Sequence, residues 1–328
     1  MHGNVTRRQV IQGAALVGAV VTTGQPALSQ GSSAAPPVRP KVRWTEMLPD
    51  ELLEAIRPHP ICYCAYGLAE PHGPYCALGL DWIKAEGIVE RAARQHGGVV
   101  APSFAWHVQD RPYFDWLGQR GVRQTLCSAI PADLWLRMAL YQIRAIDARG
   151  FHGGVLITGH YGGLEKDLRL LCEYYRRRTG SPLQLFAAAD AELIHVPGYA
   201  GDHAGITETS QLMALRPKLV DLSRKAEGWP SGRWAGCDFP LPDGRSPNAE
   251  IGERIVASQI ARLGEIQTQL LAAFKPRENW QAPSLTDAES IWHRFESLTR
   301  KYWWCSLTLE ENDQHKDLTF PGWPALGE

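Results

Sequence analysis

The segment EPHGPYCALGLD, residues 70–81, places three side chains that can bind a metal ion close together in the chain. Glu70 and His72 are two residues apart, so in an extended segment their side chains point to the same side. Asp81 can return to them after a short loop. Carboxylate and imidazole ligands without thiolates suit Zn²⁺ or Mn²⁺. Each residue also has an ordinary interpretation, since Asp81 precedes a helical pattern and is expected to be its N-cap.

Two later segments carry further side chains of the same kind. His160 follows the apolar run GGVLITG, residues 153–159, and the segment DHAGITETS, residues 202–210, contains His203 and Glu208. Glycines around His160 allow the backbone to approach closely. A carboxylate shared between two ions would hold them ~3.5–4 Å apart, where they can activate one water molecule. Taken singly, His160 could be an ordinary hydrogen-bonded histidine of a loop.

The elements that must position these residues alternate between strands and helices. Strands are expected at 60–69, 98–102, 153–159 and 182–189, and helices at 83–96, 131–148, 165–178, 208–215 and 248–274. This alternation predicts an α/β fold with a mostly parallel central sheet flanked by helices. Ligands bind at the carboxyl ends of the strands in such sheets, and the candidate metal ligands follow strand ends.

The first 29 residues have the features of an export signal. They contain the pair Arg7-Arg8, a short apolar run and a small-residue cleavage site, Ala27-Leu28-Ser29. The apolar run is about half of the ~20 residues that a membrane-spanning helix needs. We expect a twin-arginine signal, export to the periplasm and no membrane anchor after the signal is removed. An ordinary secretory signal or a disordered amphipathic start are the alternatives.

The rest of the chain divides into three parts. Residues 30–42 are a Pro-rich linker, residues 43–274 the α/β domain, and residues 275–328 an aromatic-rich C-terminal extension. We expect the extension to pack on the domain, although its aromatic side chains could also reach the substrate pocket or a neighbouring subunit.

Composition excludes some classes of partner and of fold. The formal net charge is −1, with 34 Lys and Arg against 35 Asp and Glu, so no basic surface that would favour nucleic acid is expected. The seven cysteines are an odd number without paired spacing, which argues against a disulfide framework.

Several motifs together resemble the creatininase family of metal-dependent amidohydrolases. They are EPHGP, LGLD, TGHYGG, HAGITETSQLMALRPKLVD and RSPNAEIGERI, and the resemblance spans roughly residues 60–272. The resemblance implies two divalent ions, Zn and/or Mn, bridged by Asp81, and a homo-oligomer that is a hexamer by family resemblance. It implies that His203 is the catalytic acid/base residue. The implied metal ligands are Glu70, His72, Asp81, His160 and Glu208, and the implied substrate-binding residues are Gly159, Tyr161 and Tyr199.

The reaction that the resemblance implies is attack by a metal-bridging hydroxide on the carbonyl carbon of a small cyclic amide. Two departures argue against creatinine as the substrate. Creatininase itself has Tyr-Glu after the metal-binding histidine, where this chain has Tyr161-Gly162. It also has a Trp-Asp pair shortly before the catalytic histidine, where this chain has Tyr199-Ala200.

Two other functions are compatible with the same residues. The metal site could act on a cyclic sugar-derived ketone or a formamide, or it could belong to a metal-dependent binding protein without turnover. The presence of His203 argues against a binding protein, because a protein that only binds metal does not need this acid/base residue. His107, in the segment SFAWHV, is a candidate second histidine of the pocket.

Overall fold

The computed structural model describes residues 41–108, 127–225, 239–304 and 321–323. The chain divides into the units Met1–Arg39 and Pro40–Glu328, and all of the described residues belong to the second unit. The expected export signal lies outside the described residues. Val42, which the sequence analysis places in the linker, is buried, and its carbonyl oxygen accepts a hydrogen bond of 2.7 Å from the Val100 amide. Packing therefore begins slightly before Arg43.

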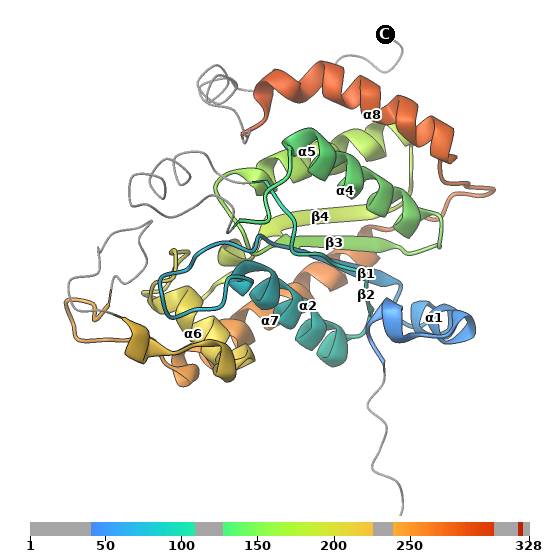
Figure 1. Cartoon of the computed structure of the whole chain (residues 1–328). Helices are drawn as coiled ribbons and strands as arrows, with labels where there is room; N and C mark the ends of the chain where they lie inside the picture. Colours follow the sequence, from blue (N-terminus) through green and yellow to red (C-terminus); the bar gives the residue numbers. More distant parts are fainter. Residues whose placement is uncertain (1–40, 109–126, 226–238, 305–320, 324–328) are drawn as a thin grey trace, which may run out of the picture. The chain divides into compact units, whose positions relative to one another are not determined.

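Four parallel strands form the central sheet, in the order β2-β1-β3-β4 (Figure 1). Every residue of the two central strands is buried, because helices cover both faces, and this explains why these strands are continuous apolar runs. The predicted fold class is confirmed. The strands are β1 (Ile61–Tyr66), β2 (Val99–Val100), β3 (Gly153–Thr158) and β4 (Gln184–Ala189).

Helices lie on both faces of this sheet (Figure 1). On one face α4 and α5 pack together, and on the other α2 packs with α7 and α6. The α-helices are α1 (Pro49–Ile56), α2 (Leu80–His96), α4 (Ala132–Asp147), α5 (Leu164–Thr179), α6 (Ile206–Leu215), α7 (Ala249–Ala273) and α8 (Leu285–Thr299). Short 3₁₀ helices are η1 (Trp44–Glu46), η3 (Asp190–Leu193), η4 (Pro217–Leu219), η5 (Leu222–Arg224) and η6 (Arg300–Tyr302).

Strand β1 shows how the sheet divides the core. Cys62 and Cys64 point into the cluster with α4 and α5, while Ile61 and Tyr63 point into the cluster with α2 and α7. Successive side chains of a strand alternate between faces, so each face receives its own apolar layer. The two cysteines act as small buried hydrophobic residues.

One expected local feature is wrong. Asp81 is not the N-cap of its helix: Gly79 is, and Asp81 lies one position inside the first turn of α2. The reason lies in tertiary contacts. The Asp81 carboxylate is buried and turned toward two histidines instead of toward the free amides of its own helix.

The C-terminal extension contributes to the core. Helix α8 packs against α4 and α5 (Figure 1), and Trp292, Phe295 and Trp303 are buried in the same cluster as Trp135. The described residues of the extension thus lie against the α/β domain.

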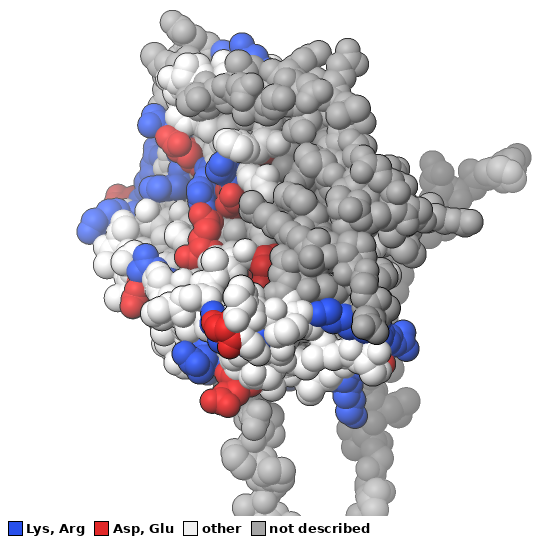
Figure 2. Space-filling view, turned by 90° about the vertical axis from the view of Figure 1, so that its left-hand side faces the viewer, with Lys and Arg blue, Asp and Glu red and all other residues white. Residues whose placement is uncertain are grey.

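The surface of the described residues shows no single dominant charge on the face drawn in Figure 2, where Lys and Arg side chains lie among Asp and Glu side chains. Among the helices of the described segments, none is both long enough and apolar enough to cross a membrane.

Candidate metal centre

All five predicted metal ligands come together at the carboxyl edge of the sheet. The segment after β1 supplies two of them, the residue pair after β3 supplies one, and the first turns of α2 and α6 supply one each. All five side chains are at most 6 % exposed. They are Glu70, His72, Asp81, His160 and Glu208.

These side chains form two ligand groups that share Asp81. In the first ligand group, Glu70–Asp81–His160, the His160 Nδ1 atom lies 3.0 Å from Glu70 Oε1 and 3.1 Å from Asp81 Oδ2. In the second ligand group, His72–Asp81–Glu208, the His72 Nε2 atom lies 3.1 Å from Asp81 Oδ1 and 3.5 Å from Glu208 Oε2. The two oxygens of Asp81 therefore face different groups, as the oxygens of a bridging carboxylate do.

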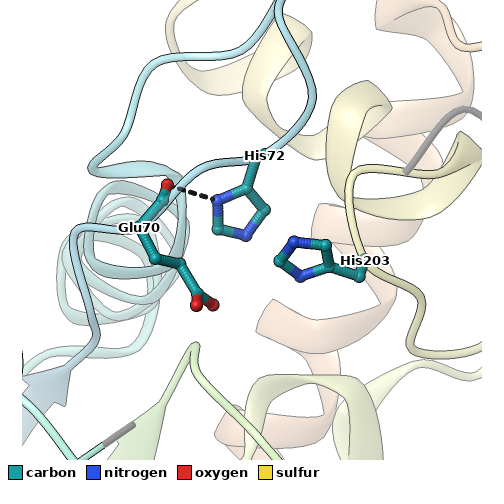
Figure 3. A group of neighbouring side chains, drawn as sticks. All are labelled: Glu70, His72 and His203. Carbon is teal, nitrogen blue, oxygen red and sulfur yellow. Dashed lines mark hydrogen bonds between the residues drawn. The ribbon is translucent and has the colours of Figure 1, made fainter. Parts of the chain in front are cut away.

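The orientation of His72 fits that of a metal ligand. Its Nδ1–H donates to the Glu70 carbonyl oxygen at 3.0 Å (Figure 3), which leaves the lone pair on Nε2. Within the described structure, Nε2 is buried and has no hydrogen-bond partner, although two carboxylate oxygens lie near it. A backbone acceptor that fixes the ring in this way is typical of metal-binding histidines. The residues present thus fit a divalent ion such as Zn²⁺ or Mn²⁺.

The buried carboxylates make the centre strongly attractive to positive charge. Burial by itself lowers the pKa of His72, but Asp81, Glu208 and Glu70 outweigh it and raise the pKa to about 9. Burial is likewise outweighed at His160, where Glu70 and Asp81 hold the pKa well above its ordinary value. Without an ion, protons on the two histidines supply the compensating charge.

His203 stacks on His72, with ring centroids 4.4 Å apart and an angle of 28° between the rings (Figure 3). Its Nε2–H donates to the Pro71 carbonyl oxygen at 3.0 Å, so in the neutral ring Nδ1 is the nitrogen that accepts a proton. Burial and the neighbouring His72 lower the pKa of His203. Glu70, His72 and His203 also form a third possible ligand group.

A cavity of about 360 Å³ opens onto these residues. Gly159, Tyr161 and His203 line it, together with Glu70, Asp81, His160 and Glu208. Tyr199 lies outside this lining, in the apolar cluster around Ile255, with the Arg245 guanidinium 5.0 Å from its ring. The size suits a small molecule.

His107 lies behind the centre and does not line the cavity. Its Nδ1 accepts from the Val108 amide at 2.8 Å, so its Nε2–H donates to Thr158 Oγ1 at 3.1 Å. The Thr158 hydroxyl in turn donates to the His160 carbonyl oxygen at 2.6 Å. His107 is thus placed to hold His160 in position, and burial with the neighbouring His160 lowers its own pKa well below the usual range.

The sequence analysis missed two charged residues of this centre, Lys84 and Asp190. The Lys84 side chain is fully buried and forms an ion pair with Glu208, and Asp190 Oδ1 lies 3.5 Å from its Nζ atom. Two signals were available. Lys84 is three residues after Asp81, on the same face of a helix, and Asp190 directly follows β4 at the edge where ligands bind.

Comparison with known proteins gives a family match. A family model described as Creatininase: Creatinine amidohydrolase matches residues 45–266. The chain belongs to the creatininase family. Creatininase-family relatives are amidohydrolases, which supports hydrolase activity here. Among curated proteins no match is found.

Solved creatininase structures share the fold. A creatinine amidohydrolase is 20% identical, with a TM-score of 0.54, and the alignment covers 72% of this chain and 99% of that chain. A creatininase in its Mn form is 19% identical with a TM-score of 0.54, covering 72% and 99%. A Bacteroides fragilis protein assigned as a creatinine amidohydrolase is 20% identical with a TM-score of 0.52, covering 74% and 99%.

Proposed function

We propose that this chain is a dinuclear metal-dependent hydrolase of the creatininase family that opens a small cyclic amide. The observation that carries the proposal is the position of Asp81, whose two oxygens each lie 3.1 Å from a histidine of a different ligand group. A carboxylate placed in this way can join two ions at the separation that two-metal hydrolases use. Solved relatives include a Mn form and a Zn-Zn form of creatininase.

Divalent ions bound there would supply Lewis acidity and a water of lowered pKa. The chain's own residues transfer the protons. His203 enters the reaction as a neutral base, because its pKa is lowered, and its Nδ1 atom takes the proton that the attacking water loses. It then returns this proton to the nitrogen that leaves when the amide bond breaks. The hydrogen bond from His203 Nε2–H to the Pro71 carbonyl oxygen holds the ring in place and, in the neutral ring, keeps the proton on Nε2.

Substrate contacts follow from the cavity. Gly159 and Tyr161 line it, and the Tyr161 hydroxyl contacts Glu208 and donates to the Asp202 carbonyl oxygen at 3.0 Å. We assign both residues to substrate binding. Tyr199 is assigned by family resemblance alone, since it lies outside the cavity lining. Gly162 and the Tyr199-Ala200 pair continue to argue against creatinine.

Metal analysis of two variants tests this function. Asp81→Ala should lose most of the bound metal, because both ligand groups lose their shared residue. His203→Ala should keep its metal and lose turnover by a factor of about 10²–10⁴. Loss of metal from His203→Ala would instead make His203 a ligand in the third group. A chain that purifies without a stoichiometric divalent ion would refute the proposal.

A substrate panel separates the remaining alternatives. The Mn²⁺-loaded and Zn²⁺-loaded protein should be assayed against lactams, hydantoins, creatinine, formamides and cyclic ketones. Turnover of the cyclic amides is expected. Turnover of a ketone or a formamide alone would mean that the same metal site acts on a different bond. Tight binding of a compound without turnover of any of them would indicate a binding protein.

We also propose export to the periplasm through the twin-arginine route and assembly into a homo-oligomer, a hexamer by family resemblance. A reporter fused to residues 1–30 should be exported, and replacement of Arg7 and Arg8 by lysine should abolish export. Sedimentation velocity of the full chain measures the subunit number, and a monomer would contradict the assembly.

A further inference from the structure

Lys84 is a charged side chain that the proposed reaction does not use. It is fully buried in α2, and its ammonium group lies within 4 Å of three buried carboxylates. Glu208 is in direct contact, Asp190 Oδ1 is 3.5 Å away and Asp81 Oδ1 is 3.9 Å away. The Tyr161 hydroxyl lies at 3.2 Å. Burying a lysine costs free energy even when it is paired, so its position among metal ligands calls for a functional explanation.

Two of the three carboxylates near Lys84 belong to the second ligand group, and Asp190 belongs to neither group. The second ligand group consists of His72, the Glu208 carboxylate and the Oδ1 atom of Asp81. The first ligand group uses the other oxygen of Asp81, which faces His160. A fixed positive charge therefore stands beside one of the two proposed ion positions.

Glu208 is already heavily engaged. Its Oε1 atom contacts both Lys84 and the Tyr161 hydroxyl, and its Oε2 atom accepts from the Ala204 amide at 2.8 Å. A second divalent ion must share this carboxylate with the ammonium group. Like charges repel strongly when both are out of water, so the lysine lowers the affinity of its own side of the centre.

We propose that Lys84 makes the two metal positions unequal. One divalent ion binds tightly between Glu70, Asp81 and His160, and the other binds weakly and exchangeably in the group that contains His72 and Glu208. This inference rests on the proposed dinuclear function and adds the asymmetry to it. The lysine supplies part of the positive charge that a second tightly bound ion would otherwise provide.

Titration of the metal-free full chain with Mn²⁺ tests the inference, with bound metal counted by elemental analysis and electron paramagnetic resonance recorded at each step. One equivalent should bind tightly and give the six-line spectrum of an isolated ion, and spin-coupled signals should appear only with excess Mn²⁺. The two affinities should differ by about 10–100-fold, the size of effect that neighbours of metal ligands have.

Lys84→Met removes the charge and should bring the two affinities together. Lys218→Met is the matched control, since Lys218 is exposed and its loss should leave the inequality unchanged. Asp190→Asn removes a carboxylate that touches Lys84 and belongs to neither ligand group, so it should weaken the second ion further. If circular dichroism shows that Lys84→Met does not fold, Asp190→Asn alone tests the inference.

Two equally tight ions in the wild-type chain, or an inequality that survives Lys84→Met, would overturn the inference and leave the proposed function standing. No change in Asp190→Asn would overturn it as well. A wild-type chain that binds no Mn²⁺ at all would instead overturn the proposed function.

Discussion

Gly159 and Asp81 touch through their main chains, so closely that a Cβ atom at Gly159 would lie 2.0 Å from the Asp81 carbonyl oxygen. The end of β3 is thereby pressed against the first turn of α2. The residue after Gly159 is His160, whose Nδ1 atom lies 3.1 Å from the Asp81 carboxylate. The spacing of these two proposed ligands is thus set by backbone contact as well as by their side chains.

Gly159→Ala should therefore weaken metal binding and destabilise the fold. The added methyl forces the two segments apart, and overpacking of this kind costs about 1–3 kcal/mol or more. Gly79→Ala is the matched control at the start of the same helix, because its Cβ would meet the Ile83 side chain at an ordinary 3.5 Å. Metal content and urea unfolding measure both effects, and wild-type metal affinity in Gly159→Ala would contradict the backbone argument.

Stability of the metal-free chain should fall as the pH rises from 6.5 to about 9. The pKa of His72 is raised from 6.5 to about 9 in the folded state, so the folded chain holds a proton that the unfolded chain releases in this interval. The stabilisation is fully present below pH 6.5 and is lost as the pH passes 9.

A bound ion displaces this proton, so stabilisation by metal should grow over the same interval. The check is the difference in Tm between the Mn²⁺-loaded chain and the chelator-treated chain, measured across this range. A difference that stays constant with pH would mean that metal and protons do not compete at His72.

Thr158→Val should lower metal affinity without removing any ligand. The hydroxyl of Thr158 connects His107 to the main chain of His160, and loss of such a support costs about 10–100-fold in metal affinity. Thr158→Ser keeps the hydroxyl and should restore most of the affinity. Isothermal titration with Zn²⁺ compares the two variants, and equal affinities in both would show that His107 has only a packing role.

Trp292→Ala should destabilise the whole domain by about 3–5 kcal/mol. Trp292 is buried in the cluster that contains Trp135 of α4. Leu285→Ala, in the same helix but at a side chain that is 61 % exposed, should change stability by less than about 0.5 kcal/mol. Chemical denaturation of both variants gives the comparison, and a separate low-stability transition for α8 alone would show that the extension is an independent attachment.

The fold and the meeting of the candidate ligands at one edge of the sheet were largely predictable because their signals are local. Apolar runs identify β1 and β3, and the rule that ligands gather at the carboxyl ends of parallel strands places Glu70 and His160 together. The two central strands are neighbours in the sheet, so residues far apart in the chain end at one edge.

Other features depend mainly on contacts between segments that are far apart in the chain. An aspartate before a helical pattern is expected to be the N-cap of the helix. In this chain the contacts of the Asp81 carboxylate with two buried histidines outweigh that preference. Lys84 would be an ordinary exposed helix residue if Glu208 and Asp190 were absent, and these come from segments much later in the chain. Its burial follows from tertiary structure alone.

Helix α8 belongs to the packed structure but lies outside the region that matches the family. The family match ends at residue 266, inside α7, which continues to Ala273. A chain shortened to the matched region would lose the last turns of that helix and would expose to water the face of α4 and α5 that α8 now covers. For this protein, the packed core therefore extends beyond the region that matches the family.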